Sequence, residues 1–179
     1  MNEPNLLIVH AAGHPVPAVH RAGFSLDHPY VERCWAPILG PSSILLLRRM
    51  PDLWKQAPTV AVPLDELARS LGLGAGTGRN SPMWRTLERV VTFRFAAWSG
   101  ERELDVYTEV PPLSPRHLDR VPESTRTRHE ELLGAHLDGL AAATGTAASI
   151  DARPARMADR LDRLQAVAPA ALAQPGIGR

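Results

Sequence analysis

The stretch LDELARSLGL, residues 64–73, indicates the fold class more clearly than any other part of the chain. Its apolar residues recur at the i, i+3, i+4 and i+7 spacing of a helix with one buried face. Two acidic residues, Asp65 and Glu66, fall in the first turn, where the helix dipole favours negative charge. Gly72 suits the left-handed position that ends many helices. We therefore expect a compact helix over residues 63–72.

A second helix is predicted shortly after the first. The glycine-rich residues 74–80 form the connection, Ser81 is a typical N-cap residue, and Pro82 suits the first helical position. The helix should extend over residues 82–91. Its apolar positions recur at helical spacing and should pack into the core: Met83, Leu87 and Val90.

The segments on either side complete a definite order of elements. Upstream, residues 42–56 have the wide apolar face of a longer helix, and residues 59–62 form a short apolar run of strand type. Downstream, side chains alternate over residues 92–97 and again over residues 103–110, with a turn-like segment between, which predicts a β-hairpin. The predicted order is helix, strand, helix, helix and hairpin.

This order, together with the run LDELARSLGL, resembles the winged helix-turn-helix family over residues 42–110, and residues 31–132 are similar to winged-helix proteins common in actinobacteria. The connection over residues 74–80 departs from the family, because the turn of this motif usually has three or four residues. The resemblance implies a mostly α fold with a small β-hairpin, of the α+β class. A winged helix-turn-helix core would carry an added N-terminal segment and C-terminal helices.

The remaining segments are predicted to flank that core. Residues 1–25 are interpreted as an N-terminal lead-in, and residues 26–143 as the winged-helix domain with flanking helices. One of these helices is expected to begin at His28 and to stop before Pro37, since proline removes a backbone donor. Residues 144–179 are expected to form a linker, a short amphipathic helix and a flexible tail. That helix would have Met157, Leu161 and Leu164 at i, i+4 and i+7.

The resemblance implies that the second helix enters the major groove of double-stranded DNA, with its N-terminal residues toward the base edges. Residues 79–94 hold four arginines and one acid, Glu88, and Arg85 and Arg89 lie one turn apart on the same face. Arg102 at the hairpin tip would contact a phosphate, although glutamates flank it. The predicted DNA-binding residues are Arg79, Asn80, Ser81, Arg85, Thr86, Arg89, Arg94 and Arg102. The alternative is that the arginines form an ordinary solvated helix face.

Composition restricts the function classes. There are 20 basic and 19 acidic residues, so only local clustering favours nucleic-acid binding. All basic residues except Lys55 are arginine, which suits phosphate and guanine contacts but is also typical of GC-rich genomes. A single cysteine, Cys34, excludes an intrachain disulfide and a cysteine-rich zinc site. No long apolar run or secretory leader is evident, so we expect a cytoplasmic protein with no membrane contact.

The sequence carries no pattern typical of a catalytic or metal site. Gly78 is followed by Arg79 and Asn80, whereas a phosphate-binding loop requires lysine and then serine or threonine after its last glycine. His10 and His14 have helical spacing, but Gly13 and a nearby proline disfavour a helix there. We expect no enzyme activity, no cofactor and no metal.

The predicted function is sequence-specific binding of double-stranded DNA, by a transcriptional regulator or by a replication or maintenance factor. A single module with so few arginines would bind weakly, so a homodimer is expected, through residues 122–142 or residues 157–164. The alternative is a winged-helix module that contacts proteins and does not bind DNA. The near-zero net charge and the glutamates beside Arg102 favour that alternative.

Overall fold

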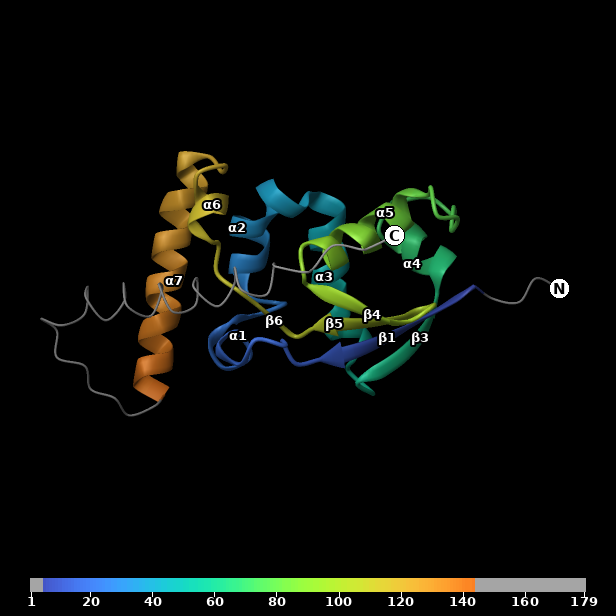
Figure 1. The fold of residues 1–179 in the computed structure, drawn as a ribbon, viewed down its shortest axis with the longest axis horizontal. Helices are drawn as coiled ribbons and strands as arrows, with labels where there is room; N and C mark the ends of the chain where they lie inside the picture. Colours follow the sequence, from blue (N-terminus) through green and yellow to red (C-terminus); the bar gives the residue numbers. More distant parts are fainter. Residues whose placement is uncertain (1–4, 144–179) are drawn as a thin grey trace, which may run out of the picture.

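The computed structural model describes residues 5–143; the linker, amphipathic helix and tail expected over residues 144–179 lie outside the described residues. The described part mixes helices with two small sheets, which confirms the α+β class. Helices α3, α4 and α5 lie on one side of the larger sheet, and α7 stands at the end of the molecule opposite α4 (Figure 1). Within residues 5–143, no helix combines the length and the apolar content that crossing a bilayer requires.

Most of the expected elements are present with nearly the expected bounds. In chain order the elements are β1 (Leu6–Ala12), α1 (Pro17–Ala22), β2 (Phe24–Ser25), α2 (Pro29–Leu39), α3 (Pro41–Leu53), β3 (Thr59–Pro63), α4 (Leu64–Ser70), α5 (Pro82–Thr92), β4 (Ala96–Gly100), β5 (Glu103–Tyr107), β6 (Glu109–Val110), α6 (Pro115–Leu118) and α7 (Glu123–Ala143).

The larger sheet has the strand order β3-β1-β5-β4. Strand β1 runs antiparallel to β3 and parallel to β5, while β4 and β5 form the expected antiparallel hairpin. A second, two-stranded sheet pairs β2 with β6. Part of the expected N-terminal lead-in is therefore an inner strand of the sheet, hydrogen-bonded on both sides, rather than an appended segment.

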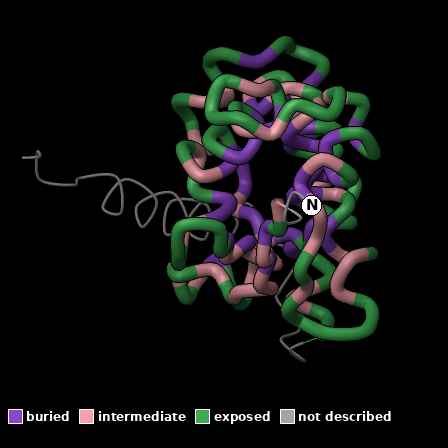
Figure 2. The backbone as a smooth tube through the Cα atoms, turned by 90° about the vertical axis from the view of Figure 1, so that its right-hand side faces the viewer, coloured by how far each residue is buried: buried purple, intermediate pink, exposed green. Residues whose placement is uncertain are grey.

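The core lies between the sheet and the helices. In β1 the side chains of Leu7 and Val9 are buried, whereas those of Leu6 and Ile8 point to the other, less covered face. The buried positions of the tube gather on the inside of the molecule (Figure 2). The apolar faces predicted for the two central helices are confirmed by the burial of Leu64, Leu67, Ala68, Leu71, Met83, Leu87 and Val90.

The expected end of the helix before Pro37 is wrong, because α2 continues through Pro37 to Leu39. The proline is exposed and costs the helix one backbone hydrogen bond. The three extra residues bury Leu39 almost completely, and burial of a leucine contributes about 1.5–3 kcal/mol. Gly40, at φ 79°, then turns the chain directly into α3.

The strand expected over residues 92–97 is also partly wrong, because α5 extends to Thr92 and β4 begins only at Ala96. The residues between them close the helix. Arg94 adopts a left-handed φ of 59°, its N–H bonds to the Val91 carbonyl, and the next N–H, of Phe95, bonds to Val90 at 2.9 Å. This is the Schellman ending of a helix, in which glycine is the usual left-handed residue.

Candidate nucleic-acid interface

Helix α5 is fixed in the fold by one apolar face and by a capped N-terminus. Met83, Leu87 and Val90 are completely buried. The Ser81 hydroxyl accepts a hydrogen bond from the backbone N–H of Trp84 at 3.2 Å, which satisfies one of the free donors of the first turn. Ser81 was predicted to bind DNA; the structure shows it half-buried, with its hydroxyl occupied as an N-cap.

The opposite face of α5 is exposed and carries Arg85 and Arg89. Within residues 5–143, the Arg85 side chain has neither an ion-pair nor a hydrogen-bond partner. The Arg89 side chain is held: its Nη2 donates to the Ile38 carbonyl at 2.7 Å, and its guanidinium lies 5.4 Å from the centre of the Phe93 ring. The two arginines therefore differ, with Arg89 held near the end of α2 and Arg85 free to reorient.

Two further arginines lie next to the ends of α5. Arg79, in the turn before the helix, places its guanidinium 5.9 Å from the Trp84 ring, and that ring stacks on Trp98 of β4. Arg94 follows the C-terminus, and both arginines are exposed, as is Asn80. We call Arg79, Arg85, Arg89 and Arg94 the arginine face.

The arginine face is not neutralised by carboxylates of the described residues. None of its members forms an ion pair there, whereas Arg48, Arg69 and Arg128 each pair with a carboxylate elsewhere in the fold. The single acid between Arg79 and Arg94 is Glu88. The positive charge of these exposed arginines is therefore available to an anionic partner.

Thr86 does not belong to this surface, although it was predicted to bind DNA. It is 4% exposed, its hydroxyl donates to the Pro82 carbonyl at 2.9 Å, and it lies 3.1 Å from the Ser42 hydroxyl of α3. The reason is its place in the helix, since Thr86 lies three residues after Met83 and four before Val90, on the buried face. The spacing alone would have shown this; the polar residue type suggested otherwise.

Arg102 lies at the exposed turn of the β4–β5 hairpin, as expected. Its guanidinium donates to the side-chain oxygen of Asn5, the residue before β1. Glu101 and Glu103 beside it are exposed, and neither forms an ion pair with it. The hairpin turn therefore presents two carboxylates and one arginine that is already hydrogen-bonded.

No group of three or more histidine, cysteine, aspartate or glutamate side chains in the described part of the chain is arranged to hold a metal ion. Sequence reasoning missed the stacked Trp84 and Trp98 beside Arg79, because their contact depends on how the hairpin folds onto α5. Comparisons with protein-family models, with curated proteins and with solved structures find no match for this chain.

Proposed function

We propose that the chain binds double-stranded DNA sequence-specifically, as a transcriptional regulator or a replication or maintenance factor, with α5 as the helix that enters the major groove. The observation that carries this proposal is the arginine face, which is exposed and has no carboxylate partner within residues 5–143. Guanidinium groups in this state can donate to phosphates and to the O6 and N7 acceptors of guanine.

The order of elements around α5 supports the same proposal. Helix α3, strand β3, helices α4 and α5 and the β4–β5 hairpin follow one another as in a winged helix-turn-helix. Two features differ from the simplest form of that motif: β1 lies between β3 and β5, and residues 71–81 form a long connection between α4 and α5. All four members of the arginine face are exposed, including Arg79 within this connection.

The two central arginines would have different roles. Arg89 keeps further N–H donors after its bond to Ile38, and its position is preset, which suits contact with a phosphate. Arg85 has no partner in the described residues, so its guanidinium can adapt to a base edge. Loss of Arg89 would then weaken binding to all sequences alike, whereas loss of Arg85 would also change sequence preference.

The test measures the fluorescence anisotropy of labelled DNA duplexes at rising salt, first with random sequences and then with sequences selected for binding. If all four members of the arginine face neutralise phosphates, log K should fall by about 3.6 per tenfold rise in salt, at about 0.9 per contact. If Arg85 contacts a base instead, the slope should be about 2.7. Arg89→Ala should reduce the slope by about 0.9. Arg126→Ala, on α7 at the other end of the molecule, is the control and should bind like the parent. Parent-like binding by a double Arg85→Ala, Arg89→Ala variant would refute the assignment of α5.

A second candidate function is a winged-helix module that contacts another protein without binding DNA. The hairpin turn favours it, since Glu101 and Glu103 would repel phosphates and Arg102 is already bonded to Asn5. In that case no duplex is retained even at low salt. A purified protein partner would then lose affinity when the arginine face is replaced by alanine.

A further inference from the structure

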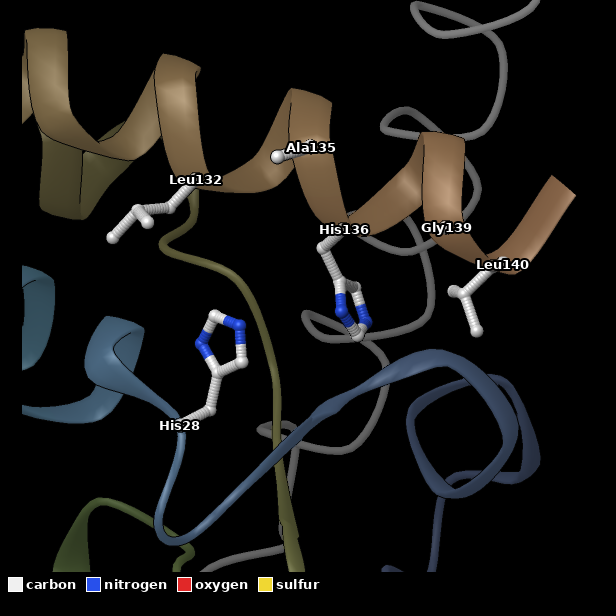
Figure 3. A pocket seen from close by; sticks show the side chains of 6 residues that line it. All are labelled: His28, Leu132, Ala135, His136, Gly139 and Leu140. Carbon is white, nitrogen blue, oxygen red and sulfur yellow. The ribbon is translucent and has the colours of Figure 1, made fainter. Parts of the chain in front are cut away.

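A pocket of about 340 Å³ lies between α7 and the start of α2 (Figure 3). Helix α7 lies at the opposite end of the molecule from α5, which carries Arg85 and Arg89 (Figure 1). Five of its lining residues come from one face of α7 and the sixth from the residue before α2: Leu132, Ala135, His136, Gly139, Leu140 and His28. Apart from the two imidazoles, the lining is apolar or glycine. A surface of this kind favours apolar side chains over a charged ligand.

The walls of the pocket are fixed by specific contacts. His28 Nδ1 accepts a hydrogen bond from the Tyr30 N–H at 3.1 Å, and His136 Nε2 donates to the Ala22 carbonyl at 3.1 Å. Both imidazole rings lie against the buried ring of Phe24, with centroid distances of 4.9 and 4.3 Å. The pocket is thus a preformed feature of the fold.

We propose that this pocket takes the chain's own residues 154–167, packed antiparallel to α7. Met157, Leu161 and Leu164 recur at i, i+4 and i+7, so as a helix they would present an apolar stripe about 10 Å long. The stripe on α7 from Leu132 to Leu140 covers about 12 Å by the same rise per residue. In the antiparallel arrangement Met157 packs near Leu140 and Leu164 packs near Leu132.

The chain connection permits this arrangement. Helix α7 ends at Ala143, so the chain leaves it three residues after Leu140. Ten residues, the number from 144 to 153, would reach about 17 Å if they behaved as a flexible chain, more than the 8–10 Å that separates the axes of packed helices. A tether this short gives the segment an effective concentration in the millimolar range, which favours the chain's own segment over that of a second copy at micromolar protein.

Hydrogen exchange of the full chain tests the proposal. Leu161→Asp should speed amide exchange over residues 132–141 by about tenfold or more, because it removes a buried leucine from the contact. Ala158→Asp places the same charge one residue from Met157, off the apolar stripe, and is the matched control. It should leave that exchange unchanged. Unchanged exchange in Leu161→Asp, or equal acceleration by both variants, overturns the proposal.

The α7 side of the contact is tested with two exposed alanines of the same helix. Ala135→Glu places a charge in the pocket, whereas Ala142→Glu places it beyond the pocket. Only Ala135→Glu should reproduce the exchange pattern of Leu161→Asp in the full chain. Light scattering after size-exclusion chromatography measures the oligomeric state and so shows whether the bound segment comes from the same chain or from a second copy. A chain that is dimeric only while Leu161 is intact would place the segment of a second copy in the pocket and would overturn the intrachain contact.

Discussion

Replacing Tyr30 with phenylalanine should strongly destabilise the fold, because its hydroxyl joins α2 to α7 and to the segment between β6 and α6. The Tyr30 side chain is completely buried on α2. Its oxygen accepts a hydrogen bond from the Leu113 N–H at 2.8 Å and is hydrogen-bonded to His129 Nδ1 on α7. Since the Leu113 N–H can only donate, the hydroxyl proton remains available for His129 Nδ1, and burial lowers the pKa of His129, which favours the neutral imidazole that can accept this proton.

The magnitude follows from the groups that Tyr30→Phe leaves without a partner. Leu113 is 0% exposed and His129 is 4% exposed, so water does not replace the lost hydroxyl at the buried edge. A buried donor or acceptor without a partner costs about 1–3 kcal/mol, and two such groups give about 2–6 kcal/mol. The free energy of unfolding of a domain is only about 5–15 kcal/mol, so the change should be evident.

Urea unfolding followed by tryptophan fluorescence measures the effect, and the chain offers a matched control. Tyr107, the other tyrosine, contacts the His14 ring but its hydroxyl has no hydrogen-bond partner among residues 5–143. Tyr107→Phe should change the free energy of unfolding by less than about 0.5 kcal/mol. A loss below about 1 kcal/mol in Tyr30→Phe, or an equal loss in both variants, would refute the assigned network.

Three further predictions concern the histidines, the end of α5 and the buried threonine. Burial lowers the pKa of His129 and of His28 below the ordinary value of 6.5, so these imidazoles take up protons at a higher pH in the unfolded chain than in the folded one. Tm should therefore fall as the pH drops below about 6.5, and in His129→Gln it should depend less on pH. Arg94→Gly relieves the left-handed φ and should raise the free energy of unfolding by about 1 kcal/mol in urea unfolding, while weakening duplex binding. Thr86→Val should leave duplex affinity within twofold in the anisotropy assay, because the hydroxyl faces α3; a larger loss would return Thr86 to the interface.

The two central helices could be predicted from the sequence because local patterns determine them. Helix α4 follows from the spacing of Leu64, Leu67 and Leu71, and its end from Gly72, which has a φ of 73° as the left-handed residue. Helix α5 follows from Ser81 at its N-cap and from its apolar stripe. Both signals lie within a few residues of the elements that they determine.

Some features of the fold could not be predicted from the sequence because they depend on contacts between residues far apart in the chain. The inner position of β1 requires pairing with β5, and a run of apolar residues does not specify its partners. The alternation over residues 92–95 resembled a strand because Phe93 and Phe95 are two residues apart, although a helix ending also places them so. The exposure of Arg85 and Arg89 follows from the helical spacing, which also places Thr86 on the buried face; Thr86 was wrongly assigned to the surface because its polar residue type was given more weight than its position.

The parallel pairing of β1 with β5 also affects how the chain can fold. Ile8 of β1 pairs with Glu103 of β5, so nearly a hundred further residues must be synthesised before β1 can pair with β5. Until then its backbone donors and acceptors have only β3 to bind. Such long-range closure slows folding and leaves strand edges open to other nascent chains. Trimming residues 6–12 would therefore remove the centre of the sheet, and a ribosome-stalled fragment that ends before β5 should remain protease-sensitive.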